Sequence, residues 1–131
     1  MKTNKDTNND IWYEELPEFC PPLKAIAPQG EKFYRVAKGD PTQNSDFFSQ
    51  RKLKPDKQFN VDECIARAVS IFKDTEDALR LSLLPKFKGG VIAEIILTER
   101  DGLIMKTFKN SHYSWWRTKQ FDYKNTRIIH L

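Results

Sequence analysis

The chain has 131 residues, of which 39% are hydrophobic and 31% are charged, and this length and composition fit one globular domain. No apolar run approaches the ~20 residues that cross a bilayer, so the sequence excludes a membrane-spanning helix. The net charge of +4 is uneven: residues 1–23 hold two lysines against five acids (2 − 5 = −3), which leaves +7 for the remainder. A basic body is typical of proteins that bind nucleic acid or a nucleotide, and it also fits a solvated surface.

The N-terminal thirty residues fall into two parts. Residues 1–10 are polar and predict a disordered leader. They hold no apolar stretch of signal-peptide type, so we expect a cytoplasmic protein. Residues 11–30 contain four prolines, which exclude a long helix. Their apolar side chains predict a Pro-rich arm packed on a single domain formed by residues 31–131.

The two cysteines, Cys20 and Cys64, are far apart in the sequence, and no ligand-spaced histidine pair accompanies them. In a cytoplasmic protein the ordinary interpretation is two reduced, structural thiols. We therefore expect neither a disulfide nor a metal site.

The sequence of residues 31–131 predicts strands with one or two short helices between them. The turn residues after Ala37, the capping pattern of Asn60 with Glu63, and Asp74 before an acidic first turn mark the boundaries. The run at residues 91–98 is apolar on both faces, as a central strand should be. This order predicts an α+β fold with a small mixed, largely antiparallel sheet. The expected strands are 32–37, 68–72, 91–98, 103–108 and 126–131, and the expected helices begin near residues 60 and 74.

Two charged residues lie inside apolar strands and are candidates for a site. Glu94 shares a strand face with Ile92 and Ile96, so it is either a catalytic or ligand-binding acid or the partner of a nearby cation. Arg35 either reaches a carboxylate or phosphate with its planar fork or faces solvent. We expect the two charges to line one cleft.

The stretch HYSWWRTKQFDY, residues 112–123, is rich in aromatic rings and cations. Alternation along an extended segment sends Trp115 and Trp116 to opposite sides. We expect one of them in the core and the other on a concave surface with His112 or Arg117, where it would stack on a base or nicotinamide ring. The alternative is that both tryptophans are buried.

Four pieces of the sequence, FYRVAKGDP, DFFSQ, AVSIFKDTEDALRL and GGVIAEIIL, follow one another between residues 32 and 98. Their order resembles small bacterial members of the ADP-ribosyltransferase superfamily, including the RES-domain toxins of toxin–antitoxin systems. The resemblance implies NAD as the cofactor, Arg35 as the residue that holds its phosphates or ribose, Ser49 as a pocket residue and Glu94 as the catalytic acid. It also implies that a tryptophan, Trp115 or Trp116, stacks on nicotinamide; His112 and Arg117 of the aromatic stretch are further candidates to line the cofactor. The Glu-x-Glu and Ser-Thr-Ser patterns of the family are missing here.

Three functional hypotheses therefore stand. The first is a protein with an ADP-ribosyltransferase-like core that binds NAD or another nucleotide, with transferase activity left open. The second is a nucleic-acid-binding module that uses the basic loop QRKLKPDK at residues 50–57. The third is a protein-interaction module, of immunity or accessory type, that uses the arm and the tryptophans.

Overall fold

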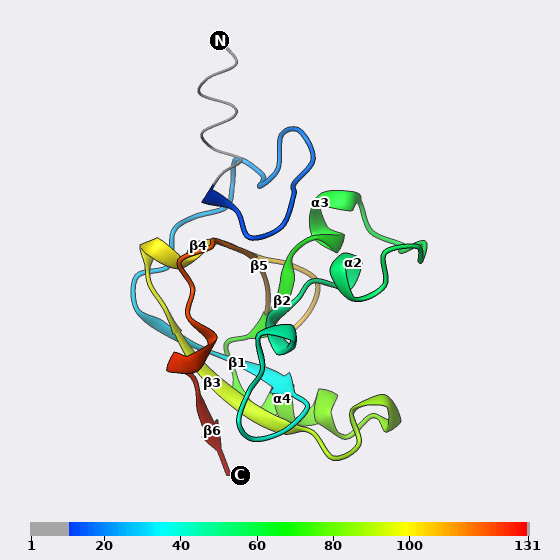
Figure 1. Ribbon diagram of the computed structural model, residues 1–131, viewed down its shortest axis with the longest axis vertical. Coiled ribbons are helices and arrows are strands. Elements are labelled where there is room, and N and C mark those ends of the chain that lie inside the picture. The colour runs from blue at the N-terminus through cyan, green and yellow to red at the C-terminus, as the bar shows by residue number, and fades with distance from the viewer. Residues whose placement is uncertain (1–10, 131) are drawn as a thin grey trace.

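Six strands form one sheet in the computed structural model, which describes residues 11–130 (Figure 1). The predicted disordered leader at residues 1–10 lies outside the described residues. The strand order is β4-β5-β2-β1-β3-β6, and each recorded pairing is antiparallel. The sheet and its short helices confirm the α+β prediction.

The strands are β1 (Glu31–Ala37), β2 (Val69–Phe72), β3 (Val91–Leu97), β4 (Gly102–Lys106), β5 (His112–Arg117) and β6 (Arg127–Ile129). The α-helices are α2 (Gln50–Leu53), α3 (Glu63–Ala66) and α4 (Thr75–Ser82), and the 3-10 helices are η1 (Asn44–Phe47), η2 (Pro85–Phe87), η3 (Glu99–Asp101) and η4 (Tyr123–Asn125).

The two predicted helix starts had different outcomes. Helix α4 begins directly after Asp74, with acids in its first turn where the helix dipole favours them. Helix α3 is capped two residues later than predicted, because the carboxylate of Asp62, and not Asn60, accepts a hydrogen bond from the backbone N–H of Ile65 at 2.9 Å. At α3 a short polar side chain thus satisfies an unpaired N–H group of the first turn, whereas the Asp74 side chain makes no such bond at α4.

Strand β3 has the central position that its continuous apolar sequence predicts. It lies between β1 and β6, and residues 92–95 are buried in succession. Only Ile96 within the strand is exposed. Because β3 has neighbours on both edges, its backbone hydrogen-bonding groups are largely satisfied within the sheet.

The two faces of the sheet have different contents. One face carries the main apolar core, in which Phe33, Ile95 and Trp115 are almost inaccessible to solvent. The register aligns a row of polar and aromatic side chains on the other face, from Glu94 through Tyr34 and Phe72 to His112. Helix α4 packs against β1, β2 and β3 and buries Ala78.

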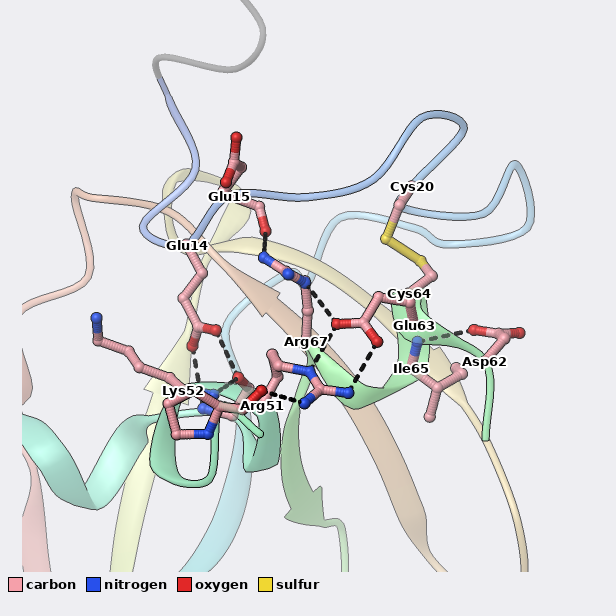
Figure 2. A network of polar contacts seen from close by, with 12 residues as sticks. Glu14, Glu15, Cys20, Arg51, Lys52, Asp62, Glu63, Cys64, Ile65 and Arg67 are labelled. Carbon is pink, nitrogen blue, oxygen red and sulfur yellow. Dashed lines mark hydrogen bonds and ion pairs between the residues drawn. A yellow bond between two sulfur atoms is a disulfide. The ribbon is translucent and has the colours of Figure 1, made fainter. Parts of the chain in front are cut away.

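The arm at residues 11–30 contacts the domain at both of its ends. Near its start the backbone N–H of Tyr13 donates to the carbonyl of Arg117 at 3.1 Å, and near its end Ile26 forms a β-bridge with Ile104. Between these contacts a disulfide joins Cys20 to Cys64 at the start of α3, as Figure 2 shows.

The expectation of two reduced thiols is wrong. The separation of 44 residues in the sequence concealed a Cα–Cα distance of 5.6 Å, which is ordinary for a disulfide. The sequence gives no direct sign of the path by which the arm brings Cys20 beside Cys64.

Near the disulfide, ion pairs join α2 with α3, and hydrogen bonds join the arm to the same region (Figure 2). Glu63 accepts from Arg51 and Arg67, each at 2.8 Å, and these hydrogen bonds hold the pKa of the Glu63 carboxyl below its usual value. Arg67 also donates to the backbone carbonyl of Glu15 at 2.6 Å. The arm is therefore fixed by covalent, polar and backbone contacts together.

Candidate site at an opening in the sheet

Strand β1 has a regular neighbour on one edge and an opening on the other. Its pairing with β3 runs over seven residue pairs, from Glu31 opposite Leu97 to Ala37 opposite Val91. Toward β2 the described residues show a single register pair, Tyr34 with Phe72. Beyond that pair the two strands separate, and we call this region, between residues 35–37 and 69–71, the β1/β2 opening.

The side chain of Arg35 bridges the β1/β2 opening. Its Nη1 donates to the carbonyl of Ser70 on β2 at 2.7 Å, its Nη2 donates to the carbonyl of Phe48 at 3.3 Å, and its Nε donates to the carbonyl of Asp46. The guanidinium thus links β1 and β2 to the loop that contains η1. It replaces backbone hydrogen bonds that the separated strands no longer make with each other.

Carbonyl groups solvate the Arg35 cation but do not neutralise it. Burial lowers the pKa of Arg35 to about 10, and the nearby Asp46 carboxylate opposes that shift. The carboxylate of Asp46 accepts its own hydrogen bonds from the backbone N–H groups of Lys38 and Gln43, at 2.9 and 2.7 Å. At pH 7 Arg35 therefore carries a full positive charge, and its recorded hydrogen bonds all go to neutral acceptors.

Arg117 also binds the loop that contains η1. It donates to the carbonyl of Phe47 at 2.9 Å and to the side chain of Asn44 at 2.6 Å, and its guanidinium lies 3.8 Å from the ring centre of Tyr13. Arg35 and Arg117 together bind three consecutive carbonyls, those of residues 46–48. Arg117 is almost fully buried, so the structure offers it no concave ligand surface.

His112 lies on β5 opposite Phe72, on the sheet face of Tyr34 and Glu94, and its imidazole is near enough to Arg35 for that charge to act on it. Its Nδ1 is 2.9 Å from the hydroxyl of Thr107, which is 2.8 Å from the hydroxyl of Ser114. Burial lowers the pKa of His112, and the charges of Lys106 and Arg35 lower it further. His112 is therefore neutral at pH 7 and is held at one ring nitrogen by a chain of hydroxyl groups.

Two aromatic rings accompany the His112 imidazole. The ring of Phe72 meets it edge to face at a centroid distance of 5.4 Å, and the ring of Phe108 lies at 5.0 Å. Phe108 is exposed and has a positive φ of 59°, which is unusual for a residue with a large side chain. The surroundings of His112 thus combine apolar rings with a hydrogen-bonding imidazole.

Glu94 does not share the environment of Arg35. The register places Glu94 opposite Tyr34 and places Arg35 opposite Ala93, and alternate residues of a strand point to opposite faces. The expectation of one cleft containing both charges is therefore wrong. Glu94 is paired with Arg127 at 3.1 Å and accepts a longer hydrogen bond from the Tyr34 hydroxyl at 3.4 Å.

Ser49 lies below the arm. Its backbone N–H and its hydroxyl both donate to the carboxylate of Glu14, and its hydroxyl accepts from the N–H of Lys52 at the start of α2. Ser49 is 1% exposed. These contacts make it a helix cap and an anchor for the arm in the present structure.

Trp115 and Trp116 point to opposite faces as predicted, but both are 0% exposed. Trp115 donates its indole N–H to the carbonyl of Asp101, and Trp116 donates to the carbonyl of Cys64. The expectation of an inner and an outer tryptophan is wrong because α3 and its disulfide region cover the second face. Of the aromatic stretch, His112 is the member that reaches a candidate site.

The sequence interpretation missed three polar residues: Thr107 and Ser114, which form the hydroxyl chain to His112, and Ser70, which faces Ser114 from β2. Ser70 and Ser114 face each other across β2 and β5. A usable signal was present, because a serine in each of two otherwise apolar, short strands is unusual for core positions. Thr107 follows the end of β4 and carried no such signal.

A surface pocket of about 510 Å³ adjoins this region, with Ser111 and Tyr113, the chain neighbours of His112, in its lining. Lys73, Arg80 and Lys106 contribute positive charge to the pocket, and Asp74, Glu76 and Asp77 contribute negative charge. A second pocket, of about 400 Å³, lies beside Arg127 and His130. Among residues 11–130 no group of three or more histidine, cysteine, aspartate or glutamate side chains is arranged to hold a metal ion.

The basic loop at residues 50–57 is tied to its own surroundings. Arg51 donates to the carbonyls of Pro55 and Lys57 as well as to Glu63, and Lys52 lies over the ring of Phe48.

No helix within the described range is long and apolar enough to cross a membrane. Comparison with protein-family models, curated proteins and solved structures finds no match for this chain.

Proposed function

We propose that the protein binds a nucleotide or a similar phosphate-bearing ligand at the β1/β2 opening, with NAD as the ligand that its family resemblance implies. One observation carries this proposal: the Arg35 guanidinium is held between two strands, and its recorded hydrogen bonds all go to backbone carbonyls, with the Asp46 carboxylate acting on it only through space. A guanidinium has five N–H donors, and the three recorded bonds leave two of them. A phosphate oxygen would complete the set and put a negative charge in direct contact with the guanidinium.

His112 and the neighbouring rings favour a ligand with both an anionic and an aromatic part. The recorded hydrogen bond of the imidazole uses Nδ1, so Nε2 remains for a ribose hydroxyl or a base. Phe72 and Phe108 flank the imidazole and offer faces or edges for stacking. The pocket of about 510 Å³ is within the ~300–1,000 Å³ range of small-molecule sites; Ser111 and Tyr113 line it, whereas Arg35 and His112 do not.

The proposal concerns binding and does not extend to transfer of ADP-ribose. Glu94 was the acid that the resemblance assigned to catalysis, but its carboxylate is on the opposite face from Arg35 and is bonded to Arg127. The predicted cytoplasmic location stays a prediction. The Cys20–Cys64 disulfide argues for an oxidising compartment, because such bonds are rare in the cytosol.

Isothermal titration calorimetry with NAD, ADP-ribose and inorganic phosphate tests the proposal. We expect saturable binding of NAD that weakens at least tenfold in Arg35→Lys, because lysine keeps the charge but loses the planar fork. Arg127→Lys is the matched control, because Arg127 is exposed and paired with Glu94, and it should bind as the natural protein does. Thermal melts of both variants separate loss of binding from loss of folding.

Two results would contradict the proposal. One is the lack of saturable heat with every phosphate ligand at millimolar concentration. The other is an equal loss of affinity in the folded Arg35→Lys and Arg127→Lys variants. A short single-stranded oligonucleotide serves as a further probe, and tight binding of it with a steep salt dependence would favour the nucleic-acid alternative.

A further inference from the structure

The arm is attached to the sheet through its backbone at its two ends. At its start, residues 11–13 are hydrogen-bonded to β5 and the residues that follow it, and at its end, residues 26–30 are hydrogen-bonded to β4 and β3. Between residues 14 and 25 no backbone hydrogen bond to the sheet is recorded in the described part of the chain. We call residues 14–25 the arm span. The ends of the arm therefore have anchors of their own, which do not depend on the span.

One cysteine of the disulfide is on a part of the domain that has its own support. Cys64 belongs to α3, and its carbonyl accepts the indole N–H of the buried Trp116 at 2.9 Å. Helix α3 is also joined to α2 by Glu63, which accepts from Arg51 and Arg67 (Figure 2). Cys64 is therefore held in place by contacts in which the arm takes no part.

The other cysteine, Cys20, lies within the arm span. Polar contacts hold the first residues of the span, because Ser49 donates to the Glu14 carboxylate at 3.0 Å and Arg67 donates to the Glu15 carbonyl at 2.6 Å. Beyond these residues the strongest recorded link to the domain is the covalent bond of Cys20. The disulfide thus joins a supported helix to a segment that has few other attachments.

The disulfide lies where a small thiol can approach it. Both cysteines are partly exposed, and Phe19, directly before Cys20, is 92% exposed. Thiol–disulfide exchange requires that a thiolate reach one of the two sulfurs. A dithiol can therefore reduce this bond in two exchange steps. The S–S bond breaks, two electrons and two protons pass to Cys20 and Cys64, and the dithiol becomes a disulfide.

We propose that the Cys20–Cys64 disulfide is a redox-sensitive clasp, whose reduction releases the arm span from α3 while the sheet and both ends of the arm stay in place. A span without its covalent link gains conformational entropy, which favours release. Arg67 then loses the Glu15 carbonyl and stays bonded to Glu63. The surface beside α3 thereby changes although the domain stays folded. The proposal does not depend on ligand binding at the β1/β2 opening.

Limited proteolysis with trypsin tests the proposal, because Lys24 is the single lysine or arginine of the arm. The full chain is first reduced with dithiothreitol, alkylated with iodoacetamide and freed of both reagents, and mass spectrometry counts the alkylated thiols. We expect both cysteines to be alkylated, and cleavage after Lys24 to be at least about tenfold faster than in the oxidised protein, because proteases cut segments that open locally. Cleavage after Lys32 in β1, where the next residue is the buried Phe33, should stay slow.

Two variants separate the covalent bond from the other contacts of the span. The double variant Cys20→Ser with Cys64→Ser should fold and should be cut rapidly after Lys24 without any reductant, which excludes an effect of alkylation. Arg67→Met is the matched control, because it keeps the disulfide and removes the bond to Glu15. Its oxidised form should be cut as slowly as the oxidised natural protein.

Four results overturn the proposal. If dithiothreitol yields no free thiols in the folded protein, the bond is inaccessible. If cleavage after Lys24 does not change in the reduced protein or in the double variant, other contacts hold the arm span, and rapid cleavage of oxidised Arg67→Met identifies the polar contact as the one that does so. If cleavage after Lys24 and Lys32 accelerates together, or if the double variant fails to fold, the disulfide supports the whole domain.

Discussion

Strand β1 is paired differently along its two edges, and the candidate site lies at the less paired edge. Toward β3 it is paired along its whole length, and toward β2 it is paired at Tyr34 and then separates. On the paired side, backbone groups satisfy one another and side chains need only pack. On the open side, a side chain must take over the hydrogen bonding, and Arg35 does so.

The charged residues on the two sides illustrate the consequence. Glu94 on β3 is matched by a cation, Arg127, and its charge is balanced within the protein. Arg35 is hydrogen-bonded to backbone carbonyls and interacts with the Asp46 carboxylate only through space, so no acid contacts its guanidinium directly. In the sequence, Glu94 and Arg35 are equally unusual, because each is a charge inside an apolar strand. The group that each side chain contacts, and not its burial alone, distinguishes a structural charge from a candidate binding charge.

Replacing Arg35 by Met should give the largest effect and tests whether the guanidinium holds the open side together. The substitution leaves three carbonyl groups without their donor. An unsatisfied buried carbonyl costs about 1–3 kcal/mol, and partial hydration will reduce the sum, so we expect a loss of about 3 kcal/mol or more. Urea unfolding measures this loss of stability.

Arg127→Met is the matched substitution on the paired side. The Arg127 side chain is 70% exposed, so its loss should cost no more than about 1 kcal/mol. If Arg35→Met costs as little as Arg127→Met, the β1/β2 opening is held by other contacts and the comparison between the two sides fails.

A smaller effect is expected from the Glu94–Arg127 pair itself. A double-mutant cycle with Glu94→Gln and Arg127→Met should give a coupling energy below about 1 kcal/mol, as for other pairs with one solvent-exposed partner. The cycle is measured by the same unfolding experiment. A coupling of several kcal/mol would show that Glu94 depends on Arg127 as strongly as the loop depends on Arg35.

The sequence predicted the fold better than it predicted the site, and the reasons are physical. Local patterns predict both elements: a continuous apolar run predicts strand β3, and an acidic first turn after Asp74 predicts helix α4. The β1/β2 opening depends on where two strands separate, and no local pattern encodes that separation. The disulfide likewise depends on the path of the arm, which brings Cys20 to Cys64 across 44 residues.

Alternation predicted the opposite directions of Trp115 and Trp116 correctly. It could not predict that α3 would cover the second face, because the covering segment is some fifty residues away in the chain. Local patterns therefore fix the direction of a side chain, whereas its exposure depends on distant segments.

The smallest expected effect is a pH dependence from His112, which probes the open side without removing any group. Burial and nearby cations lower the pKa of His112 in the folded protein, so below the ordinary value of about 6.5 the unfolded chain binds more protons than the folded one. Stability should therefore be complete above about pH 6.5 and fall as the pH drops toward the lowered pKa, by at most about 1.4 kcal/mol per pH unit for one proton. The carboxyl groups with lowered pKa values, such as Glu63 and Asp77, act in a more acidic window, so unfolding measured between pH 7 and pH 5 isolates the imidazole. His112→Asn should flatten the slope in that interval, and an unchanged slope would assign it to another group.

An anion bound beside Arg35 should raise the pKa of His112 toward its ordinary value, because it offsets the positive charges that disfavour protonation. NMR titration of the imidazole with and without NAD measures that rise. Binding of NAD that leaves the pKa of His112 unmoved would place the ligand away from the β1/β2 opening.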